Sequence, residues 1–431
     1  MENTTTPPTP EEPRGWAAKF FTIWTGQVFS LIGSALVQFA LVWWLTQQTG
    51  SATILATSSL VALLPQIVLG PFVGALVDRW NRRLIMIVAD TAIATATGVL
   101  IFLFATKSVA VWHIYAILFV RSLGGAFHHP AMTASTSLMV PHRHLTRISG
   151  LNQLLQGLLS IFAPPLGALL ISILPTQGVL AIDIGTAALA VLPLLFVPIP
   201  QPPRQVAQAN GMAEEPAYWH DLAAGFRYVV KWPGLVGLIL LAMLLNFLLS
   251  PSGALLPLLI LKEFEGGAPQ LAVVESVFGV GMILGGLILG AWGGFKRRIY
   301  TSFMGIVGLG IGVILTGLAP ANMFWLLLAA NFIIGVTQVF ANGPIGAIFQ
   351  SAIDADFQGR VFSLIGAGAT AMMPISLLIA GPLADLLGVR AWYVAGGAIV
   401  ILVTLVAWFI PAIKNIEENK HVTPPAATPA E

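Results

Sequence analysis

The stretch GPFVGALVDRWNRR, residues 70–83, interrupts a sequence that is otherwise almost free of charge. No Asp, Glu, Lys or Arg occurs from Phe20 to Val77, whereas one aspartate and three arginines lie between Asp78 and Arg83. A second apolar run begins immediately afterwards, at Leu84. A helix that crosses a lipid bilayer needs about 20 apolar residues. The charged stretch is therefore expected to be a turn between two such helices.

The composition of the whole chain points the same way. Of its 431 residues, 57% are hydrophobic and only 9% are charged, whereas a soluble domain carries about 25% charged residues. A water-soluble fold would have to expose much of this apolar surface to water, which excludes that class of protein. The chain has no cysteine, so disulfides, cysteine zinc sites and thiol catalysis are excluded as well.

Apolar runs long enough to span a membrane fill most of the chain. They predict an all-α membrane protein with twelve transmembrane helices, the first run being long enough for two helices joined near residues 47–52. The predicted spans are residues 20–77 (two helices), 84–106, 109–135, 148–173, 179–197, 235–261, 271–293, 302–318, 323–349, 361–387 and 392–413.

The distribution of basic residues predicts the orientation of these spans. Lysine and arginine are enriched on the cytoplasmic side of membrane proteins. If the N-terminus is in the cytoplasm, sixteen of the 20 Lys and Arg residues lie on the cytoplasmic side of the membrane. Of the other four, Arg121 lies within a span, and Lys107, Lys262 and Arg390 lie on the outer side. A multi-pass protein with both termini in the cytoplasm is therefore expected.

The long polar connection at residues 200–233 divides the spans into two six-helix halves, residues 16–199 and 234–413. The polar ends of the chain, residues 1–15 and 414–431, are expected to be disordered cytoplasmic tails. Within the connection, apolar residues recur at helical spacing and predict an amphipathic helix on the inner membrane surface. These residues are Trp219, Leu222, Phe226 and Val230.

The two halves repeat each other at an offset of 213 to 216 residues. Three landmarks recur in the same order, which indicates two pseudo-symmetric halves. The matched landmarks are Gly70-Pro-Phe-Val-Gly74 with Gly286-Leu-Ile-Leu-Gly290, His128-His-Pro130 with Asn342-Gly-Pro344, and Arg147 with Arg360.

Two six-helix halves joined by a cytoplasmic loop resemble the plan of the major facilitator superfamily along the whole chain. The resemblance implies a transporter whose substrate binds near the membrane midplane, between halves that rock about it. The chain has no G-x-x-x-x-G-K-[ST] phosphate loop, so this single chain is not expected to be an ATP-driven pump, and a partner ATPase is the alternative. No cofactor is expected. The sequence also offers no clustered Ser, His and Asp residues for an intramembrane enzyme.

The charged turn resembles the superfamily motif G-x-x-x-D-R-x-G-R-R/K, with Asn81 in place of a glycine. Asparagine tolerates a left-handed backbone, so that conformation is expected at Asn81. The resemblance implies a conformational latch, in which Asp78 lies beside the N-terminus of span 11 and the two glycines admit that helix. Enforcing topology is the alternative role for the arginines. The predicted latch comprises Gly70, Gly74, Asp78, Arg79, Arg82 and Arg83.

Arg121 lies about twelve residues into span 4, where a charge is costly and marks a functional pathway. In the run Arg121-Ser-Leu-Gly124-Gly125 it resembles the span-4 motif that the superfamily links to proton coupling. A structural arginine bonded to backbone carbonyls is the alternative. Asp183 and Glu275 are the candidate proton carriers, because a carboxyl group buried in a low dielectric can carry a proton near neutral pH. A structural ion pair or hydrogen bond is the alternative for either.

Two further carboxylates and two histidines have structural interpretations. Asp90 is expected to pair with the arginines of the charged turn, and Asp385, at the outer end of span 11, to contact water and Arg390. The adjacent His128 and His129 point about 100° apart on a helix and have no neighbouring Asp, Glu or Cys in the sequence to complete a metal site. We therefore expect them at a helix end or a cavity wall, and predict no metal site.

Span 5 resembles the antiporter motif G-P-x-x-G-G, with alanine in place of two glycines. A proline-kinked packing face is the alternative. The motif-like residues are Gly157, Pro164, Pro165 and Gly167.

Stretches such as Trp24-Thr-Gly-Gln27, Phe127-His-His-Pro130 and Gly359-Arg360-Val-Phe-Ser resemble the bacterial macrolide-efflux transporters, and the resemblance covers nearly the whole chain. It implies a proton-coupled exporter of bulky, amphipathic compounds in the bacterial cytoplasmic membrane. Export of a dedicated natural product, such as a siderophore or a lipid, is an alternative, and nutrient symport is a less favoured one.

The family plan implies a substrate cavity lined by spans 1, 4, 7 and 10. The expected partners are an amphipathic small molecule, protons and lipid, without nucleic acid, and the protein is expected to be a monomer. Polar residues on these apolar spans are expected to line the cavity, with helix–helix hydrogen bonding as the alternative for each. They are Gln27, Gln38, Asn246, Asn331, Gln338 and Asn342.

Overall fold

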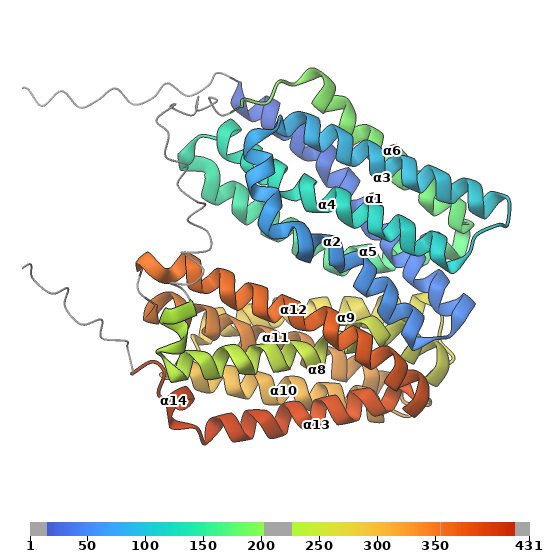
Figure 1. Ribbon diagram of the computed structural model, residues 1–431. Helices are drawn as coiled ribbons and strands as arrows, with labels where there is room; N and C mark the ends of the chain where they lie inside the picture. The colour runs from blue at the N-terminus through green and yellow to red at the C-terminus, as the bar shows by residue number, and fades with distance from the viewer. Residues whose placement is uncertain (1–14, 202–225, 354, 419–431) are drawn as a thin grey trace, which may run out of the picture. The chain divides into compact units, whose positions relative to one another are not determined.

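The computed structural model describes residues 15–201, 226–353 and 355–418, and in these residues it contains helices and no strands (Figure 1). Twelve of the described helices have 20 residues or more. They are α1 (Trp16–Thr49), α2 (Ala52–Arg79), α3 (Arg82–Ala105), α4 (Val111–Met139), α5 (His142–Ile173), α6 (Thr176–Phe196), α8 (Pro233–Glu263), α9 (Ala268–Trp292), α10 (Arg298–Leu318), α11 (Phe324–Ala352), α12 (Ala355–Leu387) and α13 (Val389–Trp408).

Eleven of these helices are long and apolar enough to cross a membrane, and α4 is the exception. Its apolar character is reduced by Arg121, His128 and His129. The predicted fold class, an all-α membrane protein with twelve long helices, is confirmed. The helix boundaries differ most from the prediction at the N-termini of α5 and α12, which each begin six residues before the predicted span. At the end of the last predicted span, Pro411 starts a separate short helix, α14 (Pro411–Lys414).

The charged turn has a different local structure in each half. Asn81 has φ −69°, and its side-chain Oδ1 caps α3 by accepting a hydrogen bond from the Leu84 N–H at 3.2 Å. The expected left-handed conformation is therefore wrong, because asparagine serves here as a helix N-cap. In the second copy, Gly293 and Gly294 have φ +77° and +79°, a conformation that favours glycine.

The described helices form two compact units. The first contains residues 15–38, 68–159 and 174–201, and the second contains residues 39–67, 160–173 and the described chain from residue 226 onward. In the first unit α3 packs against both α4 and α6; in the second, α10 packs against α11 and α13, and α8 against α12. The segments 39–67 and 160–173 belong to the predicted N-terminal half, yet they contact the helices of the C-terminal half.

The repeat found in the sequence falls on equivalent helices of the two halves. The glycine pairs lie on α2 and α9, the prolines Pro130 and Pro344 on α4 and α11, and the two arginines on α5 and α12. These are the second, fourth and fifth long helices of each predicted half.

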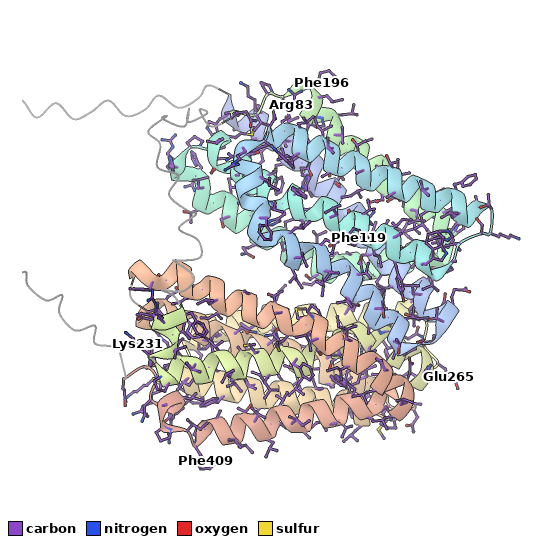
Figure 2. All side chains as sticks on the ribbon, in the orientation of Figure 1. Arg83, Phe119, Phe196, Lys231, Glu265 and Phe409 are labelled. Carbon is purple, nitrogen blue, oxygen red and sulfur yellow. The ribbon has the colours of Figure 1, made fainter. Side chains whose placement is uncertain are left out.

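Large apolar side chains cover much of the outer surface. Phe196 and Phe409 are 80% and 79% exposed, and both project from the helices in Figure 2. Exposed apolar patches of this extent require lipid rather than water around them. Two apolar residues of the predicted amphipathic helix, Phe226 and Val230, are also exposed, whereas the nearby Tyr228 and Trp232 are buried. The rest of the predicted amphipathic helix, including Trp219 and Leu222, lies outside the described residues.

Residues 415–418, at the start of the predicted C-terminal tail, contact the turn between α9 and α10. The Ile299 N–H donates to Glu417 Oε1 at 2.8 Å, and Arg297 pairs with Glu418 at 2.5 Å. These bonds cap α10 and attach the end of the described chain to the second unit.

Candidate functional site

Arg121 is buried in the first unit, where it forms an ion pair with Asp183. Its Nη1 lies 2.6 Å from Asp183 Oδ2, and the two side chains are 10% and 2% exposed. Thr97 joins the pair, since Arg121 Nη1 donates to Thr97 Oγ1 at 2.9 Å and that hydroxyl donates to Asp183 Oδ2 at 3.0 Å. Ser34 contacts the other carboxylate oxygen at 3.4 Å. The described bonds of Arg121 thus go to side chains rather than to backbone carbonyls.

A second buried carboxylate, Asp90, lies in the same unit. Gln27 Nε2 donates to Asp90 Oδ2 at 3.2 Å, and His128 Nε2 lies 3.5 Å from Asp90 Oδ1. Asp90 is 5% exposed. The expected pairing with the arginines of the charged turn is therefore wrong, because α3 directs Asp90 toward α1 and α4.

The two clusters form a stack with a repeat of seven residues on three helices. Each helix contributes one residue to each cluster, and the two residues are seven positions apart: Gln27 and Ser34 on α1, Asp90 and Thr97 on α3, and His128 and Arg121 on α4. Seven residues are close to two helical turns, or about 10 Å. We call the layers the Arg121 layer (Ser34, Thr97, Arg121 and Asp183) and the His128 layer (Gln27, Asp90 and His128).

Burial makes the charges of the Arg121 layer energetically important. A charged side chain at the centre of a membrane helix costs about 2.5–3.5 kcal/mol on insertion scales, and pairing it with an opposite charge offsets that cost. Breaking a buried pair by removing one partner is strongly destabilising, because it leaves a charge uncompensated. Asp183 is therefore the acidic partner of Arg121, whereas Glu275 on α9 has no ion pair or hydrogen bond among the described residues.

The arginines of the charged turn bind backbone carbonyls of their own unit. Arg82 Nη1 donates to the Ala134 carbonyl at 2.9 Å. Arg83 donates through Nε to the Leu194 carbonyl and through Nη2 to the Leu195 carbonyl, in the last turn of α6. A cation at a helix C-terminus is stabilised by the unpaired carbonyls there. Arg83 lies close to Phe196, the last residue of α6, in Figure 2.

The other residues of the predicted latch lie on α2, and those whose side chains the structure describes are exposed. Arg79 is exposed, and so are Gly70 and Gly74. A Cβ built on either glycine would meet no described atom within 4 Å. The Asp78 backbone lies in the last turn of α2, and its side chain lies outside what the structure describes. The latch therefore remains a prediction.

Asp385, near the C-terminus of α12, holds the N-terminus of α2. The Ala52 N–H donates to Asp385 Oδ1 at 2.7 Å, and the Thr53 N–H donates to Oδ2 at 2.9 Å. The hydroxyls of Ser51 and Thr53 add two bonds to Oδ2, at 2.8 and 2.7 Å. The expected pairing of Asp385 with Arg390 is wrong, because Arg390 pairs with Glu263 at 2.6 Å.

The proline pair of the antiporter-like motif lies inside α5, and the turn that precedes it contacts α9. Pro165 has no N–H, so the carbonyl of Ile161, four residues earlier, cannot receive its helical hydrogen bond. Ser276 Oγ on α9 lies 3.1 Å from that carbonyl and within 2.7 Å of the Ala272 carbonyl. Gly167 is also needed for packing, because a Cβ there would lie 2.8 Å from the ring of Phe39. A Cβ on Gly157 would meet nothing within 4 Å.

Replacing Ser276 by alanine is expected to lower the stability of the protein by about 1–3 kcal/mol, because the Ile161 carbonyl would lose its partner in an apolar setting. Thermal unfolding of the detergent-solubilised protein measures the change. Ser172→Ala is the matched control, since its exposed hydroxyl bonds only to the Leu169 carbonyl of its own helix. Equal unfolding temperatures for the two variants would contradict this role of Ser276.

Three of the six predicted cavity residues bond within their own helices. The side-chain amides of Asn246, Asn331 and Asn342 donate to the carbonyl four residues earlier, at 2.9, 2.9 and 3.0 Å. Gln38 is exposed and Gln338 is half-buried, whereas Gln27 belongs to the His128 layer. Gln27 is therefore accounted for by helix–helix hydrogen bonding, and the lining role of the others stays a prediction.

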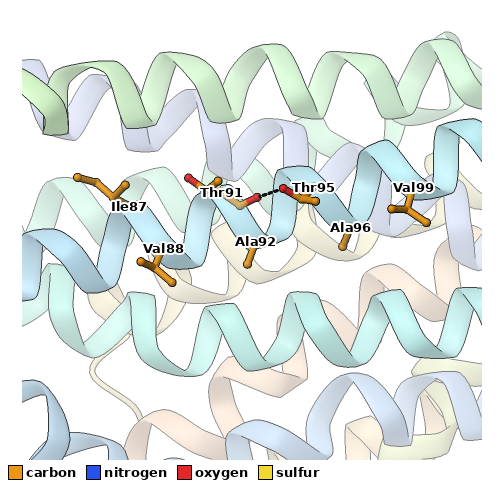
Figure 3. Close-up of a pocket in the computed structure, with 7 residues that line it drawn as sticks. All are labelled: Ile87, Val88, Thr91, Ala92, Thr95, Ala96 and Val99. Atoms are coloured by element: carbon orange, nitrogen blue, oxygen red, sulfur yellow. Dashed lines mark hydrogen bonds between the residues drawn. The ribbon is translucent and has the colours of Figure 1, made fainter.

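A shallow groove of about 620 Å³ runs along one face of α3 between Ile87 and Val99 (Figure 3). Its walls come from α3 alone, and its polar atoms are the hydroxyls of Thr91 and Thr95. The Thr95 hydroxyl donates to the Thr91 carbonyl at 2.7 Å, as Figure 3 shows. A surface groove on one helix, with two hydroxyls as its polar groups, lacks the convergent polar groups of a substrate site.

The comparison with known families identifies the fold. The family model described as Major Facilitator Superfamily matches residues 23–253 and again residues 238–430. The chain belongs to the major facilitator superfamily. The resemblance seen in the sequence is thereby confirmed, and the protein is a transporter rather than an enzyme.

Within the superfamily the chain is similar to efflux proteins. It is 36% identical to Macrolide efflux protein A of Streptococcus pyogenes, over 94% of this chain and 99% of that protein. It is 26% identical to the Multidrug efflux pump Tap of Mycolicibacterium fortuitum, over 89% of this chain and 94% of that protein. Two solved structures share the fold: a POT family transporter (TM-score 0.67, 15% identity, 93% of this chain and 97% of that chain covered) and a D-xylose-proton symporter (TM-score 0.63, 15% identity, 92% and 98% covered).

Several residues of this superfamily member that the structure singles out were not predicted as a group. Thr97 and Ser34 complete the Arg121 layer, and Asp90 with His128 forms a second layer. The signal in the sequence was the spacing of seven residues, which occurs on three different helices. It could be interpreted only once α1, α3 and α4 were known to be neighbours.

Proposed function

We propose that the protein exports bulky, amphipathic compounds of the macrolide kind by proton antiport with alternating access. The observation that carries the proposal is the buried ion pair between Arg121 and Asp183 in a chain that is similar to macrolide and multidrug efflux proteins. Such a pair has no role in lipid-facing packing, and ionisable residues inside membrane helices mark ion or substrate pathways. The proposed setting is the bacterial cytoplasmic membrane, with both termini in the cytoplasm and the protein acting as a monomer.

In the proposed mechanism, Asp183 is the group that takes up and releases the coupling proton. When Asp183 is ionised, its charge cancels that of Arg121 across 2.6 Å. When a proton binds to the carboxylate, Arg121 becomes an uncompensated buried cation, and states in which it reaches water or another partner become favoured. Proton binding thus changes the relative stability of the conformations. Glu275, on α9, is a candidate for a second carrier in the other half.

Two aspartates support alternating access through the same pair of helices. Asp385 at the C-terminal end of α12 caps the N-terminus of α2. Asp78 at the C-terminal end of α2 is proposed to cap the N-terminus of α12 in the opposite conformation. In the proposed orientation the Asp385 contact closes the outer side and the Asp78 contact closes the cytoplasmic side. Arg82 and Arg83 then serve to anchor the charged turn within its own unit.

Replacing Gly74 by leucine is expected to abolish transport while leaving the fold intact. A larger side chain has open space in the present structure, but it would prevent the close helix contact that the Asp78 latch requires. Drug efflux and thermal unfolding should be measured on the same preparations. Gly185→Leu on α6 is the control, because a Cβ there also meets nothing within 4 Å. Efflux at the wild-type rate in Gly74→Leu would contradict the latch.

The proposed function is tested by drug accumulation in bacteria that lack their own efflux pumps. Cells that produce the protein should accumulate less erythromycin than cells with an empty vector, and a protonophore should remove the difference. Unchanged accumulation would contradict macrolide export, and a difference that survives the protonophore would contradict proton coupling. Export of a dedicated natural product would instead appear as lower accumulation of that compound in cells that produce the protein, without any effect on macrolide accumulation.

A further inference from the structure

We propose that Asp90 and His128 form a second proton-binding site, stacked one heptad from the Arg121–Asp183 pair. The inference rests on the proposed function and extends it, because it assigns a coupling proton to residues other than the proposed carriers Asp183 and Glu275. The site would bind a proton between the Asp90 carboxylate and the His128 imidazole. It consists of three residues, Gln27, Asp90 and His128, which come from α1, α3 and α4.

The geometry favours a site that holds one proton. His128 Nε2 lies 3.5 Å from Asp90 Oδ1, is buried, and has no hydrogen-bond partner among the described residues. The other carboxylate oxygen is held by Gln27 at 3.2 Å. The imidazole nitrogen and the carboxylate oxygen are therefore left facing each other without a third group between them that could satisfy either.

The proton count follows from charge balance. With one proton bound, the pair is neutral overall, whether the proton resides on Nε2 beside a carboxylate or on Oδ1 beside a neutral imidazole. Without that proton the site holds a single negative charge, which is costly at 5% exposure. An imidazole and a carboxylate can each bind a proton, so the pair is suited to exchange a proton with water when a conformational change admits water.

In the part of the chain that the structure describes, no charged group other than His128 is found against Asp90. From Phe20 to Thr49, α1 has no Asp, Glu, Lys, Arg or His, and α6 has Asp183 as its sole charged residue. On α4, Arg121 lies seven residues before His128 and forms its ion pair with Asp183. On α3, Arg82 and Arg83 bind carbonyls of α4 and α6. Among the described residues His128 is thus the basic group that faces Asp90.

The two layers differ in how tightly they hold a charge. In the Arg121 layer the cation is permanent, because arginine stays protonated in proteins, and the pair distance is 2.6 Å. In the His128 layer the basic partner can itself lose its proton. The stack therefore contains one fixed ion pair and one titratable pair about 10 Å apart, an arrangement that can bind two protons at different stages of a transport cycle.

The test is the number of protons released when the purified full-length protein binds erythromycin in weakly buffered detergent, followed with a pH-sensitive dye. Asp90→Asn and His128→Gln should each release about one proton fewer per bound drug molecule than the wild type. His129→Gln is the matched control, because His129 is the exposed neighbour on α4, and it should release the wild-type number. Asp90→Glu keeps the carboxyl group and should also release the wild-type number.

The outcomes separate this inference from the proposed function. If the wild type releases protons and both variants release the same number, the second site is wrong and proton antiport stands. If the wild type binds erythromycin without releasing any proton, the proposed coupling itself is wrong, and the second site with it. Drug binding by each variant shows that it is folded, and His128→Gln alone decides the question if Asp90→Asn does not bind the drug.

Discussion

Replacing Arg121 by alanine is expected to reduce proton-driven drug transport to background and to destabilise the protein by about 3–5 kcal/mol, the usual cost of removing one partner from a buried ion pair. The reason is that Asp183, at 2% exposure, would remain as an uncompensated carboxylate between α1, α3 and α6. Uptake of a macrolide into inverted vesicles measures transport, and thermal unfolding measures stability.

The Arg121→Ala/Asp183→Asn double variant distinguishes the two effects. It has no buried charge at this position, so its stability should recover toward that of the wild type, whereas transport should stay at background because the proton-binding group is gone. If a proton gradient still drove drug transport by the double variant, the coupling role of the pair would be contradicted. A single Arg121→Ala variant with wild-type stability would contradict the energetic importance of the pair.

Replacing Asp385 by alanine is expected to open the end of the molecule where α12 meets α2. The substitution removes the four hydrogen bonds from Ser51, Ala52 and Thr53. Hydrogen bonds to a charged group contribute about 1.5–3 kcal/mol each in net terms, so losing even one shifts a conformational equilibrium by about 10- to 100-fold. Asp78→Ala, in the proposed latch of the opposite side, should shift it the other way.

The absence of cysteine in the chain makes this prediction easy to measure. A single cysteine at Ala56, which is 2% exposed and packs beside Gly381, should react slowly with a membrane-impermeant maleimide. Asp385→Ala should raise the labelling rate and Asp78→Ala should lower it. Identical rates in all three backgrounds would contradict the reciprocal latches, and a cysteine at exposed Lys107 controls for general reactivity.

The helices could be predicted from the sequence because the bilayer imposes a length and a polarity on each of them. The errors are physical too. The first turns of α5 and α12 are polar and extend beyond the apolar core of the membrane, so a hydropathy criterion began both spans six residues late. Asn81 replaced a motif glycine without adopting its backbone conformation, because an asparagine side chain can cap a helix instead.

The partners of the buried groups were harder to predict than the groups themselves. Arg121 and Asp183 were both recognised as buried ionisable residues, but pairing them requires knowing that α4 and α6 both lie beside α3. Asp90 was assigned to the nearby arginines because they are close in sequence. Those arginines instead bind helix-terminal and mid-helix carbonyls, which carry no sequence signal.

The most direct test of proton-coupled export is transport by the purified protein in liposomes with an acidic lumen and no ATP. Erythromycin added outside should accumulate in the lumen beyond the level reached in liposomes that contain Arg121→Ala, which accounts for passive trapping of a weak base. Collapsing the pH gradient with an ionophore should remove the excess. Wild-type uptake that equals uptake by the Arg121→Ala protein, or that is unchanged without the gradient, would contradict proton antiport through the Arg121–Asp183 pair.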